Sequence, residues 1–183
     1  MTTRLGIVLI LLAVALGVVS APGIAAADPA SGAAWDSVAK ILQTPDAFAG
    51  GYHRFNLPRR DIALRLGDVG VAPELALGAW AGFSDAAADA MMMGDLVLMS
   101  AELGPVLAEL ARQGLDVTAI HNHLVGEEPK LVYVHFHGMG RAVELASRLD
   151  RAVALTATPR PVAPAAPRPL GIDTTAVFGG LRR

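Results

Sequence analysis

The order of apolar segments between residues 91 and 149 constrains the fold more than any other feature of the chain. An apolar run of strand length, residues 91–99, is followed by leucine and valine at helical spacing, and this stretch ends at Gly114. Two further strands are predicted over 116–124 and 130–137, followed by a final helix. This order predicts an α+β fold, a mainly antiparallel sheet with helices packed on one face. The closest arrangement is one half of a ferredoxin-like fold.

The preceding residues extend this sheet. Helical spacing predicts a helix over 31–43, and alternation of apolar and polar residues predicts strands over 52–57 and 62–66. A third apolar segment, LALGAWAGF, follows Pro73, and its small residues leave room for another backbone or a ligand. Ser100 is expected to cap the helix that follows residues 91–99.

Both ends of the chain differ in composition from this part, so one domain is expected over residues 31–155. Arg4, a long apolar stretch and three alanines before Asp28 are typical of a secretory signal peptide over residues 1–27. An uncleaved membrane anchor is the alternative, because the apolar stretch is nearly long enough to span a bilayer. Residues 156–183 are predicted to be a Pro/Ala-rich linker and a short C-terminal tail.

These predictions place the mature protein outside the cytoplasm, secreted or in the cell envelope, with no transmembrane segment after signal cleavage. The 183 residues include no cysteine, which excludes disulfides, thiolate metal sites and cysteine nucleophiles. The net charge of −2 argues against a nucleic-acid partner bound through a basic surface.

Four of the five histidines lie on the two strands predicted over 116–124 and 130–137. Side chains two positions apart on a strand share a face, so His121 projects with His123, and His135 projects with His137. The opposite face of both strands carries mainly apolar residues and is expected to face the core.

A five-residue turn over 126–130 would place His121 opposite His135, His123 opposite Tyr133 and Ala119 opposite His137. A register shift of two would separate these pairs but keep all four histidines on one face.

Neutral imidazoles bind zinc, copper, nickel and iron. We therefore predict a transition-metal site, for zinc or copper, with His121, His123, His135 and His137 as ligands and His53 as a further candidate. The alternative is an exposed row of imidazoles that forms a solvated surface or a hydrogen-bonding cluster without metal.

Other residues give weaker signals. Thioethers bind Cu(I), but methionines in a strand mostly fill the core, which is the expectation for Met91, Met92, Met93, Met99 and Met139. A carboxylate inside an apolar strand needs a partner, which makes Asp95 a site candidate. The acidic pair Glu127 and Glu128 is expected to be solvated turn charge, with a general base beside a metal-bound water as the functional alternative.

Several pieces of the chain resemble the LppY/LpqO family of secreted bacterial proteins. They are MGDLVL, HNHL and the stretch HFHGMG, within a resemblance that covers about residues 34–158. The resemblance implies export and a single copy of the family's module, and Ile172 to Val177 looks like the opening of a second copy. The family carries no established activity.

Two functions remain open at this point. The first is metal binding by the histidines, and the second is a non-catalytic cell-envelope binding module. In the second, the histidine face and GAWAGF would line a groove for a glycan, a peptide or a lipid head group. Signatures such as G-x-S-x-G, the P-loop and H-E-x-x-H are absent, so a metal-independent hydrolase has no support.

Overall fold

The computed structural model describes residues 29–162 and 174–181. The expected signal peptide over 1–27 and residues 163–173 of the expected linker and tail lie outside this part of the chain. In chain order the elements are α1 (Pro29–Leu42), β1 (Tyr52–Pro58), β2 (Arg65–Leu66), β3 (Val69–Gly70), α2 (Pro73–Ala76), β4 (Gly78–Ser84), β5 (Ala90–Met99), α3 (Ser100–Arg112), β6 (Asp116–His121), β7 (Glu127–Glu128), β8 (Leu131–Gly140), α4 (Ala142–Val153) and α5 (Thr174–Leu181).

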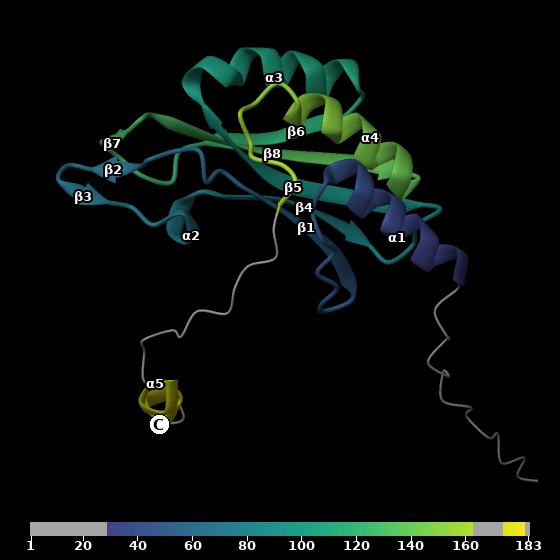
Figure 1. Cartoon of the computed structure of the whole chain (residues 1–183), viewed down its shortest axis with the longest axis horizontal. Helices are drawn as coiled ribbons and strands as arrows, with labels where there is room; N and C mark the ends of the chain where they lie inside the picture. Colours follow the sequence, from purple (N-terminus) through teal and green to yellow (C-terminus); the bar gives the residue numbers. More distant parts are fainter. Residues whose placement is uncertain (1–28, 163–173, 182–183) are drawn as a thin grey trace, which may run out of the picture.

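The main sheet has five antiparallel-paired strands in the order β1-β4-β5-β8-β6, and α1, α3 and α4 cover one of its faces (Figure 1). The α+β prediction is therefore confirmed. Because β8 pairs with both β5 and β6 in antiparallel fashion, β5 and β6 run parallel, joined by α3. This is the split βαβ unit of ferredoxin-like folds.

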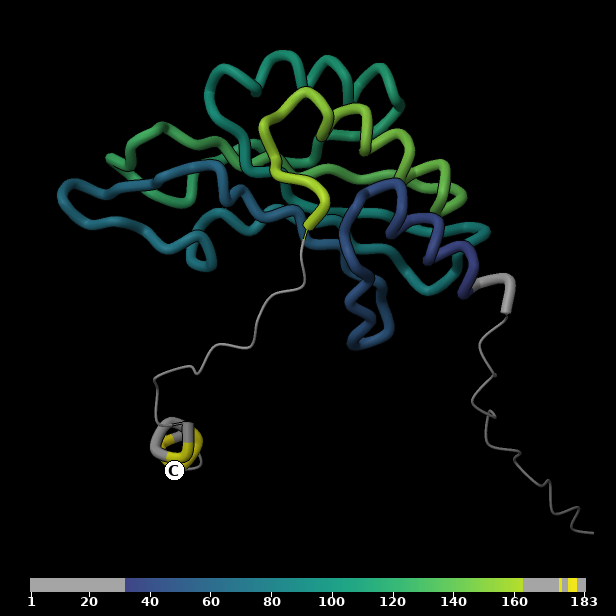
Figure 2. Tube along the Cα trace, in the orientation of Figure 1, coloured from purple at the N-terminus to yellow at the C-terminus, as the bar shows by residue number. Residues whose placement is uncertain are grey.

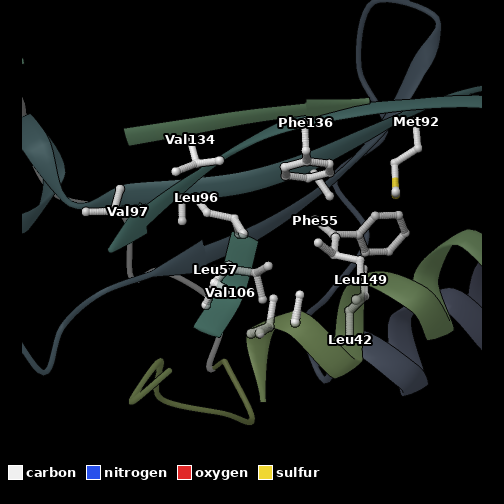
Figure 3. Packing of buried hydrophobic residues seen from close by; sticks show 14 of the residues in the cluster. Leu42, Phe55, Leu57, Met92, Leu96, Val97, Val106, Val134, Phe136 and Leu149 are labelled. Carbon is white, nitrogen blue, oxygen red and sulfur yellow. The ribbon is translucent and has the colours of Figure 1, made fainter. Parts of the chain in front are cut away.

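The hydrophobic core lies between the sheet and the three helices. Met92 and Phe136 project from the sheet toward Leu42 of α1 and Leu149 of α4, and all four are at most 1% exposed (Figure 3). Side chains alternate along each strand, so the neighbours of these residues face the opposite side of the sheet, which α1, α3 and α4 leave uncovered and which we call the helix-free face. His135 and His137 of β8 project from that face.

The strands predicted at the edges of this pattern differ from those observed. The predicted strand over 62–66 is reduced to β2, which forms a second sheet with β3 and β7 in the order β3-β2-β7. Figure 2 shows the chain around β7 lying beside the chain around β2. Because β7 pairs with β2, the predicted strand over 116–124 ends at His121 instead of continuing as a hairpin.

The start of α3 also differs from the expectation. Met99, not Ser100, occupies the N-cap position, and the carboxylate of Glu102 accepts the Met99 N–H at 2.8 Å. Glu102, at the third position of the helix, therefore satisfies the backbone N–H of the N-cap residue, as the acidic member of a capping box does.

A buried arginine ties β1 to α3. Arg59 has no exposed surface and donates to Glu102 at 2.7 and 3.1 Å, to Asp61 at 2.8 Å and to the Val97 carbonyl at 2.8 Å. Glu102 in turn accepts the Ala157 N–H at 3.0 Å. The residues that immediately follow α4 are thus bonded to the domain.

Gly94, in the middle of β5, allows a close approach between neighbouring strands. A Cβ atom there would lie 2.2 Å from the Trp80 carbonyl oxygen and 2.4 Å from the Phe136 ring. A larger residue at this position would therefore displace the Trp80 backbone or the Phe136 ring, one residue before Asp95.

No helix within residues 29–162 and 174–181 is long and apolar enough to cross a membrane.

Candidate functional site

The register between β6 and β8 places the histidines differently from the expectation. Ala119, not His121, is the partner of His135, and the partner of His121 is Tyr133. The expected pairing was wrong because residues 122–130 form a longer connection that includes β7. An irregularity between Val117 and Ala119 moves the register by one further residue at the start of β6.

Three of the predicted ligands nevertheless lie together on the helix-free face. The ring centroid of His121 is 4.8 Å from that of His135 and 4.9 Å from that of His123. We call His121, His123 and His135 the histidine triad. His135 is half-exposed and His123 is exposed, so the triad opens to solvent.

Asp95 lies beneath the triad, on the neighbouring strand. It is the direct partner of His135 in the β5–β8 register, and its Oδ2 is 3.7 Å from His135 Nε2. The side chain is only 11% exposed, and its Oδ1 is buried without a hydrogen-bond partner. Burial raises the pKa of Asp95, and the imidazoles of His135, His123 and His121 oppose that rise.

Tyr133 contacts two members of the triad, and its ring centroid is 5.8 Å from that of His121. The His123 ring stacks on the Tyr133 ring with centroids 3.6 Å apart, and the phenol donates to the Ala76 carbonyl of α2. Burial, with the negative charges of Asp95 and Glu127, raises the pKa of Tyr133 to about 12. The phenol is therefore neutral at physiological pH and acts as a hydrogen-bond donor.

The two other candidate histidines lie outside the triad. His137 is on the same face, but its Nδ1 is 3.9 Å from Asp116 Oδ2, and no ring contact in the described chain joins it to the triad. His53 is buried against Trp35, with ring centroids 3.8 Å apart, and bonds Asp46 at 2.6 Å and Asp85 at 3.0 Å. Both nitrogens of His53 are therefore used within the domain.

The weaker candidates divide between core and surface. Met92 is fully buried, whereas Met91, Met93 and Met139 are 41%, 48% and 55% exposed, so the core-filler expectation is wrong for these three. Alternation along β5 and β8 explains the difference, because the three exposed residues face the helix-free side.

The acidic pair before β8 also divides. Glu127 is buried and accepts the Leu131 N–H at 3.4 Å, which is not the solvated position expected, while Glu128 is exposed. Pairing of β7 with β2 accounts for this, because it places Glu127 inside the junction between the two sheets.

Two features of the site were not predicted. Tyr133 was expected only as a partner in the register, and its stacking on His123 depends on a loop path that the sequence does not reveal. Arg54 of β1 lies over the ring of Trp80 at 4.2 Å on the same helix-free face, and Trp80 of β4 is the direct partner of Asp95. Alternation within YHRFNLP and GAWAGF places both residues on one face, but their pairing requires the β1–β4 register.

The triad is not a formed metal site in its present rotamers. Within the described residues 29–162 and 174–181, no group of three or more His, Cys, Asp or Glu side chains could hold a metal ion as it stands. Coordination by the triad therefore requires its imidazoles to rotate, and in particular requires the His123 ring to move relative to Tyr133.

The comparison with family models matches residues 36–155 to a domain of unknown function (DUF1259). The chain belongs to the DUF1259 family. No curated protein and no solved structure matches it. The matched DUF1259 residues contain the triad, Asp95 and the exposed methionines. Because the family description assigns no activity, the function must be argued from the site itself.

Proposed function

We propose that this DUF1259 domain binds one transition-metal ion, zinc or copper, through the histidine triad, with Asp95 as the fourth donor. The observation that supports the proposal is the buried, unpartnered Oδ1 of Asp95 next to three imidazoles. A buried carboxylate oxygen without a partner is costly, and a cation held by the imidazoles would satisfy it.

The donor chemistry agrees with such an ion. Three imidazoles and one carboxylate match the ligand types that Zn²⁺ and Cu²⁺ accept, and four such donors make a tetrahedral zinc site. The exposed His123 and the half-exposed His135 open to solvent, which gives both rings room to change rotamer.

Titration with Zn²⁺ and with Cu²⁺, followed by elemental analysis of the desalted protein, tests this proposal. We expect one equivalent of metal, lost in His121→Ala and in His135→Ala. The matched control is His137→Asn, a histidine on the same face and strand that lies outside the triad, and it should retain zinc. Absence of stoichiometric metal in the parent protein, or its retention in both triad variants, would overturn the proposal.

We infer further that the protein is exported and acts in the cell envelope or outside the cell. The signal-peptide pattern over residues 1–27 supports this inference. Within the DUF1259 family, the stretches HNHL, HFHGMG and MGDLVL support a place among the LppY/LpqO proteins.

A second candidate function rests on the Arg54–Trp80 pair. Arg54 over the half-buried Trp80 ring, with its Nε bonded to Asn56 Oδ1 at 2.9 Å, presents a flat polar and aromatic surface on the helix-free face. Such a surface suits a non-catalytic module that binds a cell-envelope glycan. Thermal stabilisation by peptidoglycan fragments in the presence of EDTA, lost in Trp80→Ala, would support this function. Stabilisation that EDTA abolishes would contradict it.

A further inference from the structure

Three exposed methionines and one histidine occupy neighbouring positions on the helix-free face. In the β5–β8 register Met91 is the partner of Met139, and Met93 is the partner of His137. Directly paired Cβ atoms on antiparallel strands lie about 4.5–5.5 Å apart, and positions two apart on one strand share a face. The four side chains therefore stand at the corners of a four-sided patch, which we call the methionine patch.

The exposure of these methionines requires an explanation. Met92, between two members of the patch, is fully buried in the core, whereas the exposed fractions of Met91, Met93 and Met139 are 41%, 48% and 55%. Three thioethers gathered on a solvent-facing surface do not serve core packing. They do provide soft donors with enough flexibility to converge on one ion.

His137 adds an imidazole to the methionine patch as the register partner of Met93. Its Nδ1 faces Asp116 Oδ2 at 3.9 Å, on the β6 side of β8, while the methionines of β5 lie on the other side. At 3.9 Å this separation is longer than a hydrogen bond, so Asp116 does not occupy the ring nitrogen and the imidazole is available as a metal ligand.

We propose that the methionine patch binds a monovalent soft metal ion, Cu(I), through the thioethers of Met91, Met93 and Met139 and the imidazole of His137. Thioether sulfur selects Cu(I) over zinc and over hard divalent cations. The site shares no ligand with the histidine triad and goes beyond the function proposed for it. Binding involves no change in oxidation state.

The first test uses anaerobic Cu(I) competition titrations against a chromogenic chelator, with Ag(I) as a redox-inert second probe. The measurements use a His121→Ala/His135→Ala background, so that the triad does not contribute. We expect one equivalent of Cu(I), lost when Met91, Met93 and Met139 are all replaced by leucine, which keeps side-chain volume and apolar character. Met92→Leu and Met99→Leu are the matched controls and should bind as the parent does.

Two further measurements examine the ligands directly. X-ray absorption at the copper edge should show sulfur neighbours in the parent and none in the triple leucine variant. His137→Asn should weaken Cu(I) binding, because it removes the imidazole of the methionine patch. Absence of Cu(I) binding in the double-histidine background, equal Cu(I) affinity in the triple leucine variant, or a copper spectrum without sulfur neighbours would overturn the proposal.

The outcomes for the two sites can be separated. The triple leucine variant, made with an intact triad, should still bind one equivalent of zinc, because the triad contains no sulfur ligand. Zinc or Cu²⁺ binding by the parent without Cu(I) binding in the double-histidine background would overturn the methionine patch alone. Cu(I) binding in that background without zinc or Cu²⁺ binding by the parent would overturn the triad alone.

Discussion

Asp95 has a carboxylate that the fold buries and leaves partly without hydrogen bonds. In the metal-free protein this negative charge is expected to lower stability, because desolvation is offset only by nearby imidazoles. Asp95→Asn removes the charge and keeps the size of the side chain. We expect a higher melting temperature for the metal-free variant, together with weaker zinc binding, as measured by calorimetry and titration. A variant that melts below the parent would contradict the destabilising role of the buried charge. A variant that binds zinc as well as the parent does would contradict the role of Asp95 as a metal ligand.

Gly94 provides a second test at the scale of one residue. Gly94→Ala places a methyl group against the Trp80 carbonyl and the Phe136 ring, so we expect a loss of about 1–3 kcal/mol of unfolding free energy, or more. Gly104→Ala in α3 is the matched control, because a Cβ there meets nothing within 4 Å. This control should gain roughly 0.5–1 kcal/mol. Chemical denaturation measures the unfolding free energy of both variants. Equal changes in the two variants would show that a methyl group at Gly94 meets no steric clash.

The ion pair between Arg59 and Glu102 joins β1 to the start of α3. Removing one partner leaves a buried charge, so Arg59→Met should lower the unfolding free energy by about 3–5 kcal/mol. Arg60→Met is a suitable control, because this neighbouring arginine is exposed. Urea denaturation compares the two. A loss for Arg59→Met no larger than that of the control would show that the pair does not stabilise the junction.

The same pair predicts how stability depends on pH. Although burial raises the pKa of Glu102, hydrogen bonds from Arg59, Met99 and Ala157 outweigh burial and hold it below its usual value. A carboxyl group whose pKa is lower in the folded state stabilises the fold above its unfolded pKa. That contribution is lost as the pH falls through the folded value. Melting temperature measured across the acid range should therefore fall less steeply in Glu102→Gln than in the parent, and parallel curves would contradict the assignment.

Elements with a clear local pattern were predictable from the sequence, and those defined by distant partners were not. Helix α3 follows from its leucine spacing and from Gly114, whose φ of 67° is favourable for glycine. The β6–β8 register was not predictable, because it depends on Glu127 and Glu128 pairing with β2, far away in the chain. The two His-x-His pairs were sufficient to place three histidines on one face, but not to separate His137 from them.

At the scale of the whole molecule, helices α1, α3 and α4 all cover the same face of the main sheet, and both proposed metal sites lie on the other (Figure 1). If the protein is exported, both sites meet their metal ions outside the cytoplasm, so the export prediction needs its own test. We expect the form recovered after export to begin at Asp28, which intact-mass measurement and N-terminal sequencing can determine. Replacing Ala25 and Ala27 with bulky residues should block this cleavage. Recovery of a protein that retains residues 1–27 and remains with the membrane would favour the alternative anchor.

The side chains of strand β8 alternate between the two sides of the sheet. Tyr133, His135 and His137 face one side, while Val134 and Phe136 face the core. Deleting one residue inside β8 would exchange these two sets, bringing imidazoles into the core and an aromatic ring to the surface. The exposed residues Val125 and Gly126, between His123 and β7, carry no such constraint. Natural length variation among relatives is therefore expected at these two positions, whereas the spacing within residues 131–140 should stay fixed.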